Sequence, residues 1–143
     1  MSKTVSPEQL EMELNKYLRE YIEHIDDLVF ETTNKLTKQA KSAVSKESPK
    51  RSGDYSKGWT IKTIKNAKTY TQKIWNSKKY RITHLLEFGH KVKRNGQVVG
   101  SAKAFPHIRK IENEYVEKFI NEIERGARKW LFQSLKIDLL VNI

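Results

Sequence analysis

The sequence predicts an α+β protein in which a long N-terminal helix and a long C-terminal helix pack on a small antiparallel sheet. Apolar side chains recur at helical spacing over residues 1–47 and again over residues 104–129. Between these segments lie two short runs rich in β-branched and aromatic residues, at 59–65 and 69–75. The first pattern is typical of amphipathic helices, and the second is typical of strands joined in a hairpin.

The N-terminal helix has a clear start signal. Pro7 suits the first helical position, and Gln9 stands three residues after Ser6. Ser and Gln at this spacing form a capping box, in which each side chain accepts a hydrogen bond from the other residue's backbone N–H. A helical series of apolar residues follows: Leu10, Leu14, Leu18, Ile22, Ile25, Leu28, Val29, Leu36, Ala40 and Ala43. This series predicts a helix of roughly nine or ten turns.

Residues 48–58 are expected to form a loop, because Ser, Pro and Gly interrupt the helical pattern there. Gly53 is expected to make a structural turn within this loop. The two runs 59–65 and 69–75 then predict an antiparallel hairpin, since a short polar break separates them and β-branched and aromatic side chains favour strands.

A short helix is predicted over residues 81–88. Gly89 is expected to end it, because glycine readily takes the left-handed conformation found after many helices. Glu87 is expected to pair with a nearby lysine or arginine. The apolar side chains of the helix are expected to be buried: Leu85, Leu86 and Phe88.

The rest of the chain contains three further segments. Residues 91–100 hold an Asn-Gly turn and form either a small hairpin or a loop that becomes ordered only on assembly. Pro106 opens the second long helix. Residues 130–143 are more apolar than a free tail, and periodicity leaves both a helix and a strand open there. Because exposed apolar segments often mark contact sites, six residues are predicted to form an interface with the subunit's own long helix, a neighbouring copy or another protein: Trp130, Leu131, Phe132, Leu135, Leu139 and Leu140.

The length of 143 residues predicts a single domain, 1–143. Its expected parts are a long helix at 1–47, a loop at 48–58, the sheet, short helix and basic loop at 59–103, a helix at 104–129 and an apolar segment at 130–143. There is no cysteine, which excludes disulfides, thiol catalysis and cysteine metal sites and is typical of proteins made in a reducing cytoplasm. Neither a secretory signal nor a membrane-spanning segment is expected.

Positive charge is concentrated in the middle of the chain. Residues 35–110 hold 20 lysine or arginine residues against three acids, whereas the two flanks are net acidic. Such segregation favours a middle that meets an anion or an acidic partner, although a solvated lysine-rich surface remains the simpler alternative. The residues predicted to face DNA or a partner are Lys62, Lys65, Lys73, Lys91, Lys93, Arg94 and Lys103.

His84, Glu87 and His90 resemble a metal site at first sight. Residues three apart share a helix face, but Gly89 ends the helix before His90, and His107 belongs to another element. No metal site is therefore predicted. No nucleophile elbow or phosphate loop is present in the sequence. We therefore expect no catalytic residue and no cofactor.

Three segments in a fixed order resemble the neck and tail-completion proteins of long-tailed bacteriophages, the family of HK-type gene product ten. They are the loop Ser48-Pro49-Lys50-Arg51-Ser52-Gly53, the helix end Leu85-Leu86-Glu87-Phe88-Gly89 and the segment Pro106-His107-Ile108. The resemblance extends over roughly residues 5–127, and the three segments together are more specific than any one of them.

The resemblance implies a structural, non-enzymatic subunit of the virion, made in the host bacterial cytoplasm and placed where capsid and tail join. It implies a ring of identical copies, such as a hexamer or a dodecamer, around the path of the genome. Other neck, connector and tail proteins and non-specific contact with double-stranded DNA are the expected partners, with no membrane and no small-molecule substrate. The alternatives are a stand-alone, non-specific DNA-binding protein and a small enzyme.

Overall fold

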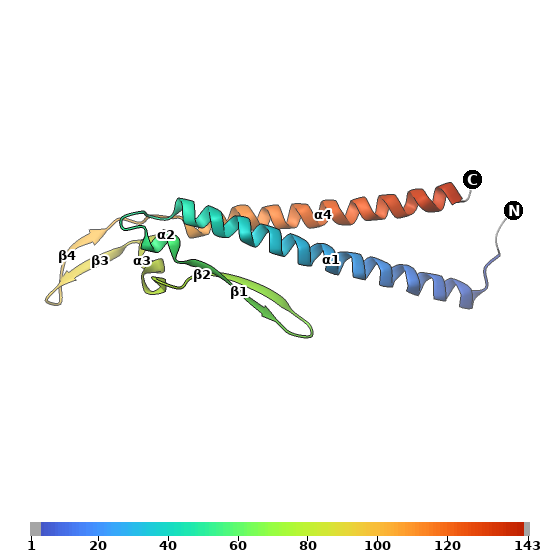
Figure 1. Cartoon of the computed structure of the whole chain (residues 1–143), viewed down its shortest axis with the longest axis horizontal. Coiled ribbons are helices and arrows are strands. Elements are labelled where there is room, and N and C mark those ends of the chain that lie inside the picture. The colour runs from blue at the N-terminus through green and yellow to red at the C-terminus, as the bar shows by residue number, and fades with distance from the viewer. Residues whose placement is uncertain (1–3, 142–143) are drawn as a thin grey trace. The chain divides into compact units, whose positions relative to one another are not determined.

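The structure is a computed structural model that describes residues 4–141, with the side chains described through residue 134. Its elements in chain order (Figure 1) are α1 (Pro7–Glu47), α2 (Asp54–Lys57), β1 (Trp59–Lys65), β2 (Tyr70–Asn76), the 3-10 helix η1 (Tyr80–Ile82), α3 (Thr83–Phe88), β3 (His90–Arg94), β4 (Gln97–Ala102) and α4 (Ile108–Val141). β1 pairs with β2 and β3 with β4, each antiparallel, in two separate sheets. The predicted α+β class is confirmed, with two small sheets where one was expected.

The start of α1 follows the predicted capping box. The backbone N–H of Ser6 donates to Gln9 Oε1 at 3.1 Å, and the N–H of Gln9 donates to Ser6 Oγ at 3.3 Å. These two bonds satisfy donors that a helix N-terminus would otherwise leave unpaired. At the other end, Ser48 Oγ donates to the carbonyl of Val44 at 2.5 Å, just before Pro49 prevents the helix from continuing.

The chain divides into two compact units. The first contains residues 1–32 and 121–143, and the second contains residues 33–120. In the first unit the helices run antiparallel, and a Cβ at Gly126 would lie only 2.6 Å from Leu28, so glycine allows the two helices to approach closely. The indole of Trp130 has its ring centroid 5.4 to 5.5 Å from those of three α1 side chains, Tyr17, Tyr21 and His24.

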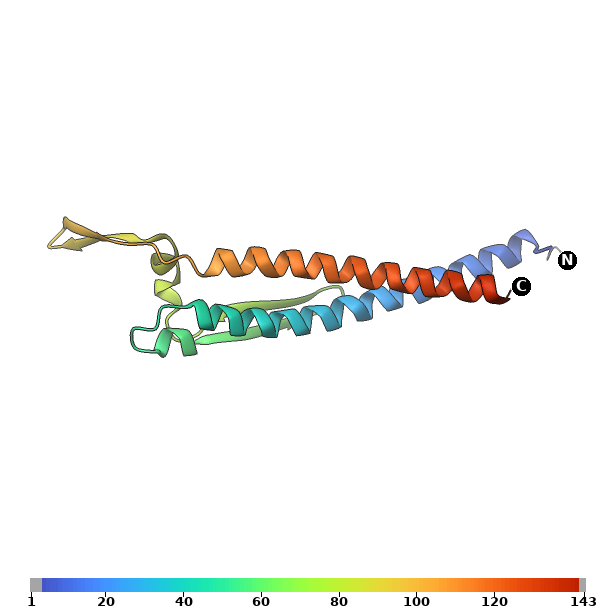
Figure 2. The ribbon, with the colours of Figure 1, turned by 90° about the horizontal axis from the view of Figure 1, so that it is seen from above.

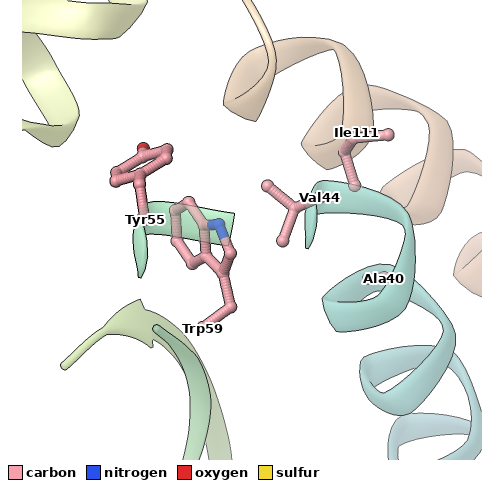
Figure 3. Close-up of a cluster of buried hydrophobic side chains, with 5 residues drawn as sticks. All are labelled: Ala40, Val44, Tyr55, Trp59 and Ile111. Carbon is pink, nitrogen blue, oxygen red and sulfur yellow. The ribbon is translucent and has the colours of Figure 1, made fainter. Parts of the chain in front are cut away.

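The core of the second unit is small and joins four elements. Its buried apolar side chains are each 4 to 7% exposed (Figure 3): Ala40 and Val44 from α1, Tyr55 from α2, Trp59 from β1 and Ile111 from α4. These side chains come from elements that are far apart in the sequence. Their burial removes apolar surface from water and holds the second unit together.

The β1–β2 hairpin lies along the C-terminal part of α1 (Figure 2). Its register pairs Trp59 with Asn76 at the base and Lys65 with Tyr70 near the tip. Two hydrogen bonds attach it to α1, since Tyr70 Oη and Gln72 Nε2 both donate to Asn34 Oδ1, at 2.7 and 2.8 Å. The inner face of the hairpin is thereby fixed, and the alternate residues are left on the outer face.

Residues 91–100 are predicted to form either a small hairpin or a loop that becomes ordered only on assembly. The structure shows the hairpin, formed by β3 and β4. Asn95 and Gly96 have φ angles of 50° and 80°, as a tight turn between right-twisted strands requires. Every residue of β3 is exposed, and in β4 only Ala102 is partly covered. Within the second unit this hairpin extends away from α1 and α4 (Figure 1).

The C-terminal segment is helical, because α4 continues without a break to Val141. Of the two alternatives for residues 130–143, the helix is therefore the one observed over the described part. Within residues 4–141, neither α1 nor α4 is apolar enough over a sufficient length to cross a membrane.

Gly89 ends α3 as predicted, but its conformation differs from the expected left-handed helical one. Its φ is 74° and its ψ is 171°, so the backbone is extended with a positive φ. A Cβ here would lie 2.7 Å from the carbonyl oxygen of Ala102 and 2.9 Å from the nitrogen of Ala104. Glycine is required both by the φ angle and by the backbone that passes beside it.

We expect Gly89→Ala to lower the free energy of unfolding by about 2–3 kcal/mol, because strain and a close backbone contact act together. Gly100→Ala is the matched control, since an added Cβ there meets nothing within 4 Å. It should change stability by no more than about 0.5 kcal/mol. Urea denaturation of both variants measures the difference, and equal effects would contradict the assigned role of Gly89.

Candidate functional site

Glu87 belongs to α3 but caps the N-terminus of α4. Its Oε2 accepts hydrogen bonds from the backbone N–H groups of His107 at 2.8 Å and Ile108 at 2.9 Å. Its Oε1 accepts a third from the N–H of Arg109 at 2.9 Å. The first N–H groups of a helix have no partner within the helix and carry partial positive charge, so a carboxylate is the side chain that suits this position.

The environment of Glu87 determines its ionisation. The side chain is only 6% exposed, and burial by itself would raise its pKa. The three backbone N–H groups and the nearby His107 oppose burial and outweigh it, so the pKa of Glu87 is lowered from its usual value. The expectation that Glu87 pairs with lysine or arginine is wrong. Its hydrogen-bond donors are backbone groups about 20 residues further along the chain.

His107 is fully buried and connects Glu87 to Tyr55. Its Nδ1 lies 2.7 Å from the carbonyl oxygen of Phe105, which only accepts, so Nδ1 carries the proton. Its Nε2 lies 2.7 Å from Tyr55 Oη, and in the neutral imidazole with the proton on Nδ1 this nitrogen accepts a hydrogen bond from the phenol O–H. Burial, and then the charge of Glu87, raise the pKa of Tyr55 to about 12, which keeps the phenol in the donor form.

Two further polar side chains fix the loop that precedes the sheet. Ser48 Oγ accepts a hydrogen bond from the indole N–H of Trp59 at 2.8 Å. Asn76 is 1% exposed, and its Nδ2 donates to the carbonyl of Tyr55 at 2.7 Å. A Cβ at Gly58 would collide with the Asn76 side chain, so this position needs glycine. The loop, the α3 end and the segment before α4 therefore meet in one buried polar junction.

The residues considered as metal ligands lie in different environments: Glu87 and His107 are buried side by side, and His84 and His90 are exposed. Both oxygens of Glu87 and both ring nitrogens of His107 already have hydrogen-bond partners within the junction. His84 and His90 are exposed, on α3 and β3. Across the described residues, no three histidine, aspartate or glutamate side chains converge as ligands of one ion.

Phe88 is 67% exposed, so the expectation that it is buried is wrong. Its ring instead lies 5.9 Å from the guanidinium carbon of Arg109, measured to the ring centroid. The short helix α3 turns Glu87 toward the junction, and the next residue therefore points away from it. Leu85 and Leu86 are partly covered.

The seven basic candidates are all exposed and fall into two groups. Lys62, Lys65 and Lys73 lie on the β1–β2 hairpin. The second group, Lys91, Lys93, Arg94 and Lys103, lies on β3 or just after β4. The two hairpins extend in different directions within the second unit (Figure 1), so the structure does not gather these residues on one surface.

Lys62 and Lys73 are direct cross-strand partners in the β1–β2 register. Like charges in this position repel each other and destabilise a sheet. Their outer face also carries Ile64 and Trp75, which are 47% and 37% exposed. An exposed face that combines paired lysines with apolar side chains is suited to a partner that is both acidic and apolar. Sequence reasoning missed this pairing, because it depends on the register.

The predicted interface residues of α4 have different environments. Trp130 packs on α1, Leu131 is partly covered, and Phe132 is 69% exposed. Leu135, Leu139 and Leu140 have side chains outside the described residues. Gly53, with a φ of 80°, precedes α2, and Pro106 stands two residues before α4, so both turn residues lie at element boundaries.

Residues 8–89 match the model of the family of bacteriophage HK97-gp10-like tail components. This match covers more than half of the chain. The chain belongs to this family. The HK97-gp10 match extends from α1 to Gly89 and includes Glu87, whereas the β3–β4 hairpin and α4 lie beyond it. Comparisons with curated proteins and with solved structures found no match.

We expect Glu87→Gln to lower the free energy of unfolding at pH 7 by about 1–3 kcal/mol, because an amide replaces a buried carboxylate that accepts three hydrogen bonds. Since the folded-state pKa of Glu87 is lowered, its stabilisation is fully present above the usual carboxyl pKa. It disappears as the pH falls through the lower folded value, so wild type and variant should converge in acid.

The matched control is Glu114→Gln, an exposed partner of Lys118 whose ion pair contributes little. Urea titrations between neutral and acid pH measure both effects. A difference between wild type and Glu87→Gln that is independent of pH would contradict the assigned ionised cap.

Proposed function

We propose that this tail component acts in the neck of the virion, as a ring of identical copies around the DNA path that joins the capsid to the tail. Membership of a tail-component family supports a structural role among other phage proteins. The distribution of charge supports the position near DNA. The second unit, residues 33–120, has 21 lysine or arginine residues and six acids, a net charge of +15.

The β3–β4 hairpin is the observation that carries the DNA contact. No acidic residue occurs between Glu87 and Glu112, and this interval includes the whole hairpin. Lys91 and Lys93 alternate along β3 and share one face, and both strands are exposed. An exposed basic ribbon of this kind makes non-directional contacts with phosphates, which give affinity without sequence readout.

A ring would repeat the basic β3–β4 hairpin around the DNA, and this repetition supports the proposed ring assembly. One subunit offers only a few cations to a duplex, whereas a ring presents the same cations from all sides of the channel. Head-to-tail contacts between identical copies produce closed rings when the rotation between neighbours closes. The isolated chain is therefore expected to bind DNA weakly, and the assembled ring more strongly.

Loss of the gene from its phage should yield filled heads and free tails that remain separate in electron micrographs. Joined particles should return when the wild-type chain is supplied from a plasmid, and density for this chain should then lie between capsid and tail. Joined, infectious particles in the absence of the chain would overturn the proposed function.

Replacement of Lys91, Lys93 and Arg94 together by Gln should weaken binding to unrelated duplexes equally. It should also reduce the slope of log affinity against log salt by about 0.9 for each DNA phosphate that the variant no longer neutralises. The matched control replaces Arg125, Arg128 and Lys129, three exposed cations of the first unit, and should leave the slope near that of wild type.

Fluorescence anisotropy over a salt series measures the binding, and light scattering on the same samples reports the oligomeric state. Unchanged binding by the hairpin variant would show that the hairpin faces protein or solvent. Strong, salt-dependent binding by a monomer that never forms rings would favour the stand-alone DNA-binding protein.

A further inference from the structure

The second unit contains an open apolar groove of about 530 Å³. Its lining includes Leu36 and Ala40 of α1, Ile74 of β2, and Tyr115 and Phe119 of α4. A groove lined by aliphatic and aromatic side chains is suited to the apolar side of an amphipathic helix.

Two features indicate that an additional segment completes this groove. Val116 lines the groove and is 53% exposed, so the groove presents an aliphatic side chain to solvent. Gln72 also lines the groove, and its buried Oε1 accepts no hydrogen bond from any described residue. A buried acceptor of this kind is unusual in a finished interior and invites an incoming N–H donor.

The chain carries a segment whose surface fits the groove. In the N-terminal half of α1, four large apolar side chains at intervals of four residues are each at least half exposed: Leu10, Leu14, Leu18 and Ile22. These four residues, the apolar stripe, lie on adjacent turns of one helix. They remain exposed although α4 packs on α1 within the same unit. Asn15 and Arg19, beside the stripe, carry N–H donors.

Charge favours a contact between the stripe of one copy and the groove of another. Residues 1–32 hold eight acids against three basic residues, a net charge of −5. The groove belongs to the unit with a net charge of +15, and its charged lining residues are Lys73, one of the paired lysines, and Glu112. Packing of two stripes against each other would instead place acidic helices side by side, which costs electrostatic energy.

We infer that the apolar stripe of one copy docks in the groove of the next copy, with acidic residues of α1 beside Lys73, which lines the groove. Because the two surfaces are different, the contact is heterologous and continues from copy to copy, as a ring requires. This inference rests on the self-assembly in the proposed function and specifies the surfaces that make it. In this contact, the carboxylates of α1 would also reduce the repulsion between Lys62 and Lys73.

The chain has no cysteine, so introduced thiols report only the chosen positions. Leu18→Cys and Val116→Cys are prepared separately in the full chain, mixed, and treated with a short bis-maleimide. The mixture should give a cross-linked dimer that neither variant gives alone. The matched control is Val99→Cys on β4, which is 60% exposed and outside the groove. Mixed with Leu18→Cys, it should give about tenfold less dimer.

A charge reversal tests the electrostatic part. Lys62→Glu with Lys73→Glu in the Val116→Cys chain should reduce the dimer about tenfold, whereas Lys91→Glu with Lys93→Glu should leave it nearly unchanged. A dimer from Leu18→Cys alone at the same yield would show that stripes pack on each other and would overturn the inference. A yield no higher than that of the Val99→Cys control would also overturn it.

Light scattering on the same samples separates this inference from the proposed function. Rings that form without the Leu18–Val116 cross-link would leave the proposed ring standing and reject the groove as its contact. A chain that remains monomeric and forms no cross-link would reject the docking surfaces, while the test on heads and tails still decides the role in joining them.

Discussion

The carboxylate of Glu87 at the N-terminus of α4 is the interaction on which the second unit depends. A helix that starts inside a protein needs acceptors for its first N–H groups, and here a side chain from a different element supplies them. The same carboxylate lies beside His107, which bonds in turn to Tyr55. One buried charge thus connects three segments that are far apart in sequence, and its removal would leave several donors unpaired.

The small core around this junction explains why so much apolar surface remains outside. Five side chains form the buried apolar cluster of the second unit, and the first unit consists of two helices that contact each other at Trp130 and at the close approach of Leu28 to Gly126. Two helices cannot cover every apolar residue that a helix as long as α1 presents, which leaves Leu10, Leu14 and Leu18 half exposed. Surfaces of this kind are characteristic of subunits that complete their burial by assembly.

Charge, like exposed apolar surface, is unevenly distributed along the chain. Residues 1–32 are net acidic, whereas the second unit is net basic. The second unit has a large excess of lysine and arginine, and it places Lys62 directly across from Lys73. A sheet tolerates such a pair at a cost in stability, and an acidic partner bound beside the pair would offset this cost. The exposed β3–β4 hairpin, in contrast, lies outside the set of residues that line the apolar groove and presents its cations to solvent. Two basic surfaces of one unit can therefore meet different partners.

The sequence by itself determined the features that depend on neighbouring residues. The Ser6–Gln9 capping box, the β1–β2 hairpin and the Asn95–Gly96 turn follow from local hydrogen bonds, strand preferences and permitted φ angles. The tertiary structure alone decided the partner of Glu87, the exposure of Phe88, the Lys62–Lys73 pair and the convergence of Tyr55 with His107. These contacts join residues up to 52 positions apart. The packing of the elements determines which donors reach a buried carboxylate such as Glu87. Local sequence does not determine that packing.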